Sequence, residues 1–217
     1  MRKYTCLSNS IIGLFLLTIV SCEEVFIPDP IDPRLAKYTE EGYNTAGAIV
    51  NQDAWKSVAE YGYDLGYLFG APDRDFPFMK VYNNHDSVVL QFDGQIMKGK
   101  EVLTNSSIIF HLQDLNIHSF SDLKTLKNRK IQLDGVKNYG AFTRSEYHDP
   151  NYFPACSGTA GIGQIYFRNV TFNDSLNRAI ISGTFGFTIS NSACGTTEVS
   201  YGRFDSRFGI NTGFRIE

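Results

Sequence analysis

The chain is poor in the residue types and local patterns that carry common chemistry. Its 217 residues include four Cys, four His, three Met and one Trp. It has no CxxC pair, no HExxH and no GxSxG, the patterns typical of zinc sites, zinc proteases and α/β-hydrolases. The sequence therefore predicts no catalytic residue, no metal site and no cofactor, and it favours a protein that is not an enzyme.

A basic stripe is also missing. The formal net charge is −3, and the basic residues form no long run along the sequence. Nucleic acid is therefore not an expected partner. Aromatic residues and glycine are plentiful, with 17 Phe, 12 Tyr and 19 Gly. This composition is typical of β-structure with many turns.

The N-terminus carries an apolar run that is too short to cross a bilayer. A basic start is followed by about ten apolar residues at 11–20, as in a secretory signal peptide, whereas a transmembrane helix needs roughly 20. A transmembrane helix is the weaker alternative. The ending IVSC at 19–22 resembles the lipobox of bacterial lipoproteins. The resemblance implies that residues 1–21 are removed and that Cys22 carries a lipid that anchors the protein in a membrane.

The residues after Cys22 are predicted to form a tether. Two acidic residues follow it directly, and three prolines between 28 and 33 disfavour helix and strand. We expect an extended segment over 22–42 and a single domain over 43–217. Acidic residues behind a lipidated Cys resemble the surface-export signal of Bacteroidota lipoproteins, which implies the outer membrane of the cell envelope, with the domain surface-exposed or periplasmic. Without residues 1–21 the chain has 18 basic and 23 acidic residues, a net charge of −5.

Two cysteines are left in the domain once Cys22 carries a lipid. Cys156 and Cys194 each lie among turn-forming residues, and an extracytoplasmic compartment favours disulfides. We predict a disulfide between them, which would close a loop of about 38 residues and add roughly 3–4 kcal/mol on the chain-entropy model. The alternative is two unrelated thiols.

Apolar and polar residues alternate along most of the domain, which is the period of a β-strand. One short helix is predicted near 120–127, behind a capping start at Ser119. The alternation changes phase near Arg168 and near Gly202, which predicts β-bulges. The pattern favours an all-β fold, a single antiparallel β-sandwich or barrel-like domain of about ten strands. Strands are predicted near 46–51, 54–58, 63–69, 78–83, 87–93, 107–113, 130–134, 139–146, 162–172, 178–190 and 197–207, with a turn at 93–94 and a glycine-rich loop at 157–163.

Two segments resemble small Bacteroidota lipoproteins of unknown function. Residues 47–55 (GAIVNQDAW) are similar to their first hairpin, an apolar strand, a turn at Asn and then Trp, although Gln52 stands where Gly is commoner. Residues 181–187 (ISGTFGF) and 202–205 (GRFD) are similar to their closing hairpin, in which a GTFxF strand pairs with a GxFD strand. The resemblance implies a β-rich extracytoplasmic domain and no particular reaction.

One loop is the strongest candidate for ligand binding. It contains Tyr147, His148, Tyr152 and Phe153, three aromatic rings among hydrogen-bonding groups. This composition suits the apolar face and polar edge of a sugar ring, and it also suits an adaptable protein-binding loop. The alternative is that the rings fold back onto the domain. A depression shared by Tyr147, Tyr152 and Trp55 would support a binding role.

Two triplets resemble the O-glycosylation pattern of Bacteroidota proteins. They are DSV at 86–88 and DSL at 174–176, with Ser87 and Ser175 as the acceptors. Both lie at predicted turns, where a transferase can reach them.

Three functions are left open. The favoured one is a non-catalytic binding module for a glycan or an envelope protein, held at the membrane by its lipid. The second is a structural or assembly lipoprotein of the envelope without a small ligand. The third is a hydrolase with an unrecognised site. The oligomeric state is also left open.

Overall fold

The computed structural model of the chain describes residues 29–57, 78–82, 86–98, 101–145, 156–173, 176–192, 195–210 and 213–217. The predicted strand at 63–69 lies outside these residues. The strands are β1 (Thr45–Val50), β2 (Asp53–Ser57), β3 (Phe78–Tyr82), β4 (Ser87–Lys98), β5 (Glu101–Gln113), β6 (Arg129–Asp134), β7 (Tyr139–Arg144), β8 (Cys156–Asn173), β9 (Arg178–Ser192), β10 (Gly195–Ile210) and β11 (Gly213–Ile216), and η4 (Phe120–Leu126) is a 3₁₀-helix. β4, β5 and β8 are longer than predicted, and β11 is not among the predicted strands.

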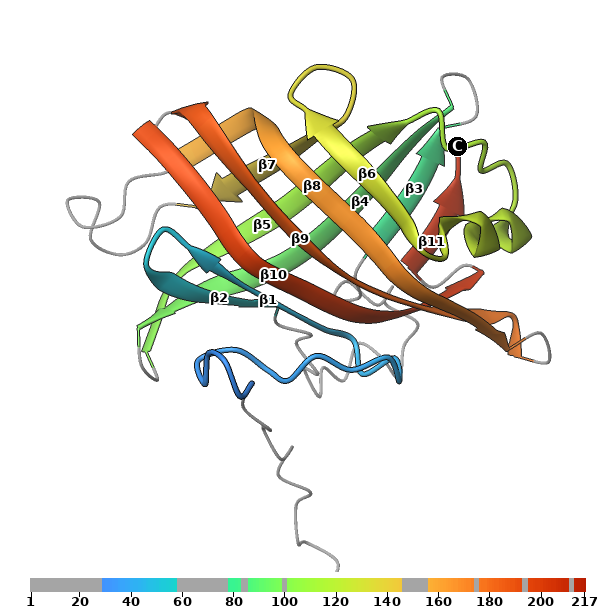
Figure 1. Ribbon diagram of the computed structural model, residues 1–217, viewed down its shortest axis with the longest axis horizontal. Coiled ribbons are helices and arrows are strands. Elements are labelled where there is room, and N and C mark those ends of the chain that lie inside the picture. Colours follow the sequence, from blue (N-terminus) through green and yellow to red (C-terminus); the bar gives the residue numbers. More distant parts are fainter. Residues whose placement is uncertain are drawn as a thin grey trace, which may run out of the picture.

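Eight of the strands close into a barrel (Figure 1). Around the wall the order is β1, β2, β4, β5, β7, β8, β9, β10 and back to β1, and each neighbouring pair is antiparallel. β3 and β11 complete the wall between β4 and β10 beyond the ends of β2 and β1, and β6 pairs with the middle of β8. The predicted all-β antiparallel domain is confirmed, and its architecture is the barrel.

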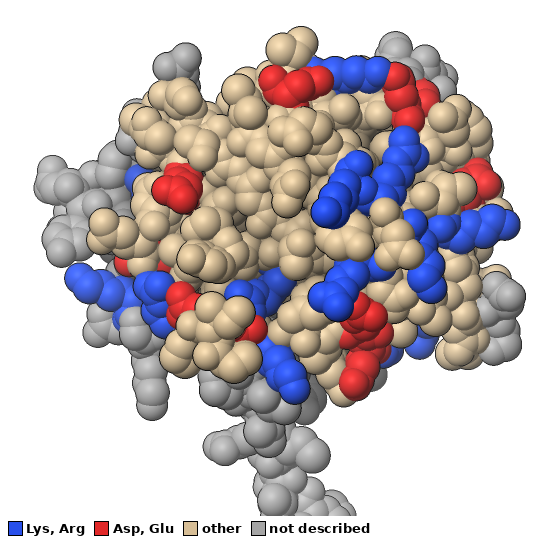
Figure 2. Space-filling view, in the orientation of Figure 1, with Lys and Arg blue, Asp and Glu red and all other residues tan. Residues whose placement is uncertain are grey.

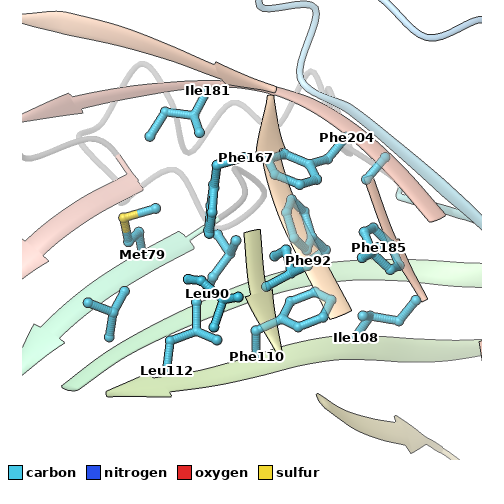
Figure 3. Close-up of a cluster of buried hydrophobic side chains, with 14 of the residues drawn as sticks. Met79, Leu90, Phe92, Ile108, Phe110, Leu112, Phe167, Ile181, Phe185 and Phe204 are labelled. Atoms are coloured by element: carbon cyan, nitrogen blue, oxygen red, sulfur yellow. The ribbon is translucent and has the colours of Figure 1, made fainter. Parts of the chain in front are cut away.

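Phenylalanine rings fill the middle of the barrel. The alternation along each strand sends one set of side chains inward, among them Phe92, Phe110, Phe185 and Phe204 (Figure 3). The ring centroids of Phe110 and Phe185 are 5.1 Å apart, and those of Phe92 and Phe204 are 5.3 Å apart. Burial of each such side chain contributes roughly 1.5–3 kcal/mol. The inside of the barrel is therefore a packed core at this level, which directs attention to the outer wall.

The predicted turn at 93–94 is wrong, because β4 continues through it. Glycine at position 94 instead allows β4 to pack closely against β2. A Cβ atom at Gly94 would lie 2.6 Å from the Trp55 ring and 2.3 Å from the Lys56 carbonyl oxygen. The Trp55 side chain is 0% exposed and lies in the core. Trp55 therefore cannot line an exposed depression with Tyr147 and Tyr152, which themselves lie outside the described residues.

Both predicted bulges are confirmed. The register between β8 and β9 shifts between Phe167 and Asn169, and that between β9 and β10 shifts between Val199 and Gly202. The glycine-rich loop predicted at 157–163 is wrong, since these residues lie within β8. Their glycines are accommodated in a strand because neighbouring side chains occupy the space where a Cβ atom would lie, as at Gly161, where Phe187 would be 2.6 Å away.

The hairpin pairings that the resemblance implies are present. β1 and β2 pair around a turn in which Asn51 has a left-handed backbone, with φ of 55°. In the closing pair, Gly183 lies opposite Phe204 and Thr184 opposite Arg203. The pairing is thus confirmed, while membership of that family stays a prediction.

The N-terminal strap, residues 29–44, lies against the outer wall of the barrel. Leu35 is fully buried and packs with Ile49 of β1 and Ala54 of β2. The carboxylate of Asp205 in β10 accepts hydrogen bonds from the Thr39 hydroxyl and from three backbone amides of residues 41–43. The predicted boundary at residue 43 therefore needs correction, since the folded domain already includes the chain from Asp29.

The predicted helix near 120–127 is confirmed in place, as the 3₁₀-helix η4. The Ser119 hydroxyl donates to the Asp122 carboxylate at 2.8 Å and makes no cap to a backbone amide. Leu123 and Leu126 are buried, and Phe120 packs edge-on against Phe172 of β8 and Phe214 of β11. Among the described residues, no helix is long and apolar enough to cross a membrane.

Candidate functional site

Most of the residues predicted from sequence as site residues lie outside the described part of the chain. These are Cys22, Tyr147, His148, Tyr152, Phe153, Ser175 and Cys194. Ser87 is described, half-buried at the start of β4, directly after the left-handed Asp86. Cys156 is described, buried at the start of β8. A site must therefore be built from other residues.

A shallow depression crosses the outer wall over β6, β8, β9 and β10. It is open to solvent and has a volume of about 520 Å³, and it is called here the outer-face depression. Figure 2 shows that the middle of this face carries almost no charge. The side chains that line it and point outward are Gln132, Ile162, Gln164, Thr184, Thr188, Glu198, Ser200 and Tyr201.

Strand register explains why polar side chains gather there. Gln132 of β6 lies opposite Gln164 of β8, which lies opposite Gly186 of β9. Residues directly opposite across a sheet point to the same face. Because the apolar partners one residue away point into the core, such as Ile165 and Phe185, the amides must point outward. The depression is thus lined by the polar, outward-facing side chains of the alternating pattern on four adjacent strands.

Two glycines contribute backbone to the lining of the depression. Gly163 lies opposite the buried Leu133 and Phe187, so only Gly186 faces outward. A Cβ atom at Gly163 would lie 2.1 Å from the Gly186 carbonyl oxygen, so the tight contact between β8 and β9 requires glycine there. At Gly186 the added Cβ atom would approach only the Val199 carbonyl oxygen, at 3.3 Å. Packing therefore restricts position 186 much less, and its glycine leaves space open in the middle of the polar surface.

Tyr201 stands at the edge of the depression in an unfavourable backbone conformation. It lies in the β10 bulge with φ of 52°, and its side chain is 63% exposed. A left-handed backbone costs a bulky residue roughly 1–2 kcal/mol compared with the right-handed one, and such positions concentrate at functional sites. Folding alone would favour glycine here, so the exposed Tyr201 ring is a candidate contact for a ligand.

A buried ion pair links Tyr201 to the N-terminal strap. The Nε of Arg203 donates to the Tyr201 carbonyl oxygen at 3.3 Å, and the Arg203 guanidinium forms an ion pair with Asp29. The two charged side chains are 12% and 8% exposed. Burial alone would raise the pKa of Asp29, but the amides of Ile31 and Asp32 and the charge of Arg203 outweigh burial and lower that pKa below 3.8. The strap and the bulge are therefore held together by charge at neutral pH.

This ion pair predicts an acid-sensitive strap. A carboxyl whose pKa is lower in the folded state stabilises that state above its ordinary value of 3.8, and the contribution is lost as the pH falls through the lowered pKa. We expect amide hydrogen exchange of residues 29–44 to quicken below about pH 3.8 before the strands of the barrel exchange. Asp29→Asn should show the fast exchange already at pH 7. Equal exchange of strap and barrel at every pH would contradict the prediction.

The charged side chain of Arg144 lies at the end of β7, just before the predicted aromatic loop in the sequence. Arg144, the last residue of β7, lies opposite the buried Ser106 and Cys156, so it points to the inner side of the wall. Burial lowers the pKa of Arg144, and the charge of Asp53 acts in the opposite direction.

The outer-face depression offers hydrogen-bonding groups, one exposed aromatic ring and one carboxylate. Its amides, hydroxyls and one exposed aromatic ring can hydrogen-bond to a polar ligand and stack on it. Glu198 is the one carboxylate in its lining, whereas glycoside hydrolysis by acid–base chemistry uses two. In the described ranges, no three His, Cys, Asp or Glu side chains come together as a metal site.

Sequence reasoning did not single out any of these lining residues. The phase change at Gly202 did mark the bulge that carries Tyr201. The outward Gln and Thr positions follow from the alternation, but the sequence does not say which four strands lie next to one another. The chain matches no protein-family model, no curated protein and no solved structure. Fold and site together define the class: a closed antiparallel β-barrel with a shallow polar depression on its outer wall, in which Glu198 is the one charged lining residue.

Proposed function

We propose that this chain is a non-catalytic glycan-binding module, held at the outer membrane of the cell envelope by a lipid on Cys22. The observation that carries the proposal is the outer-face depression, which combines the outward-facing Gly186, surrounding amides and hydroxyls, and an exposed Tyr201 ring at the β10 bulge. Sugars present an apolar C–H face and a polar edge of hydroxyls. The aromatic ring suits the first and the Gln and Thr side chains suit the second.

A glycan suits this surface better than a protein partner does. Protein interfaces are centred on large apolar or aromatic side chains that become fully buried. Among the lining residues, only Ile162 and Tyr201 have a large apolar or aromatic side chain that is exposed to solvent. The depression is also shallow and open along the sheet, a shape that suits a chain lying across it.

The segment between the proposed lipid anchor and the folded domain is short. With Asp29 bound to Arg203, the segment from Cys22 to 28 is seven residues long and spans at most roughly 25 Å when extended. The barrel would therefore stay close to the lipid, with the strap as its attachment point.

Tyr201→Ala is expected to lower glycan affinity at least tenfold, because it removes the stacking ring. The mature chain is screened on an array of polysaccharides, and the strongest is titrated by calorimetry. Tyr43→Ala is the matched control, since Tyr43 is 59% exposed but lies on the strap. Tyr201→Gly should lose affinity equally while gaining about 1 kcal/mol of stability from relief of the left-handed strain. Equal loss with Tyr43→Ala, or none with Tyr201→Ala, would count against the site.

The predicted disulfide between Cys156 and Cys194 is also part of the proposal. Ser192, two residues before Cys194, lies so near Gly158, two residues after Cys156, that a Cβ atom on Gly158 would be 2.7 Å from the Ser192 Cβ. Peptide mapping without reductant is expected to find the linked peptides. Cys194→Ser should then lower the free energy of unfolding by roughly 3 kcal/mol. Recovery of both thiols in alkylated form would exclude the pair.

A further inference from the structure

We propose that the bound glycan is acidic and that Lys130 of β6 binds its negative group, at the end of the outer-face depression. The inference rests on the proposed function and narrows its ligand. It places a charge-recognising position beside the polar surface, on residues that do not line the depression itself.

Strand register puts Lys130 in line with the depression. Gln132 faces Gln164, and two residues further along the same strands Lys130 faces Tyr166. Both pairs point outward, and two residues in a strand span roughly 6.6 Å. A ligand lying over the two glutamines therefore reaches Lys130 by extending a short distance along β6 and β8.

The Tyr166 ring holds the ammonium group in place. The Nζ of Lys130 lies 5.1 Å from the centroid of that ring. A cation over an aromatic face is attracted to it and keeps its charge. No ion pair between Lys130 and a carboxylate is found within the described ranges. The amine is exposed, so an incoming anion can reach it without breaking an ion pair of that kind.

Two of the cations on this side of the barrel are already paired with carboxylates. Figure 2 shows Lys and Arg gathered beside the uncharged area. Arg168, further along β8, lies 3.4 Å from the Glu40 carboxylate, and Arg203 pairs with Asp29. Lys127 and Arg129, like Lys130, have no carboxylate partner among the ion pairs of the described residues. Lys130 is distinguished from them by its place in line with the depression and by the Tyr166 ring beneath its ammonium group.

Glu198 makes the two ends of the ligand path differ in charge, because it lies far from Lys130. It lies on β10 opposite Thr188, which faces Ile162 of β8. Lys130 lies three strands away on β6, a separation of roughly 14 Å across the sheet alone. Charges this far apart are largely screened, since the Debye length is about 8 Å at physiological salt. Each charge therefore acts separately, Lys130 attracting the anionic end of a ligand and Glu198 repelling it.

The test compares charged and neutral forms of the same polysaccharides. The probes are polygalacturonate with its full methyl ester, and dextran sulfate with dextran, titrated against the mature chain by calorimetry. The charged member of at least one pair is expected to bind more tightly. Lys130→Gln should lower that affinity about fivefold, as expected for an exposed charge pair, and leave affinity for the neutral member unchanged. Glu198→Gln should raise affinity for the charged member about twofold.

The outcomes separate this inference from the proposed function. Equal affinity for charged and neutral members, with Tyr201→Ala still abolishing binding, overturns the inference and leaves the glycan-binding module standing. Binding to none of the four probes overturns the inference, and failure across the whole polysaccharide array overturns the proposed function as well. Thermal unfolding is the folding control, because both replaced side chains are exposed and neither variant should unfold earlier.

Discussion

Asp205→Ala is expected to release the N-terminal strap and to lower the free energy of unfolding by about 3–5 kcal/mol, since each hydrogen bond to a charged group contributes roughly 1.5–3 kcal/mol. The Asp205 side chain is 1% exposed. Its carboxylate accepts from the Thr39 hydroxyl at 2.5 Å and from the amides of Glu41, Gly42 and Tyr43 at 3.1, 2.8 and 3.2 Å. Alanine would leave all four donors without their acceptor.

Denaturant unfolding measures the loss, and hydrogen exchange of residues 29–44 shows whether the strap is its source. Glu198→Ala is the control on the same strand, and as an exposed position it should change stability by no more than about 0.5 kcal/mol. Asp205→Asn should fall between the two, because an amide keeps one acceptor oxygen and presents an NH₂ group to the remaining donors. A strap that stays protected in Asp205→Ala would show that Leu35 and the Asp29–Arg203 pair hold it alone.

Phe185→Ala is expected to cost about 3–5 kcal/mol, the usual range for removing a buried aromatic ring. Phe185 is 4% exposed and its ring lies 5.1, 6.2 and 6.3 Å from the centroids of Phe110, Phe92 and Phe204. The ring also fills the space above Gly202, where a Cβ atom would be 2.2 Å away. The variant therefore removes both a core contact and the support beneath the bulge of Tyr201.

The control is Phe185→Leu, which keeps most of the volume and should cost no more than about 1.5 kcal/mol. Denaturant unfolding gives both values. Because the ring supports the bulge, glycan affinity measured on the folded Leu variant should fall as well, although no lining side chain that contacts the ligand has been removed. Similar losses of stability for Ala and Leu would contradict the role given to the ring's packing.

The strap changes how the N-terminal sequence is understood. Its prolines do exclude regular structure, as expected, but an irregular segment can still pack. Leu35 is buried and packs against Ile49 and Ala54, and Asp29 forms an ion pair with Arg203. Neither contact can be predicted from the local sequence. A single leucine in a polar segment forms no repeating apolar pattern, and the sequence around a carboxylate does not show which distant cation will pair with it.

The candidate site shows the same limit. The outward direction of Gln132 and Gln164 follows from alternation within their own strands, and the bulge at Gly202 follows from a break in that alternation. Their assembly into one depression depends on β6 lying beside β8 and β10 beside β9. The predicted aromatic loop and its Tyr147, His148, Tyr152 and Phe153 stay a prediction, since they lie outside the described residues.

The sequence by itself determined the all-β class, most strand positions, the bulges and the side of each strand that faces water, because these depend on a two-residue period that each segment carries locally. It also predicted the lipid anchor at Cys22. Only the tertiary structure decided that the sheet closes into a barrel, that residues 29–44 belong to the fold, and that Tyr201 lies beside the outer-face depression. These features depend on contacts between residues far apart in the chain, such as Thr39 and Asp205, separated by 166 positions. A local pattern sets which way a side chain points, whereas closure of the barrel sets what it meets there.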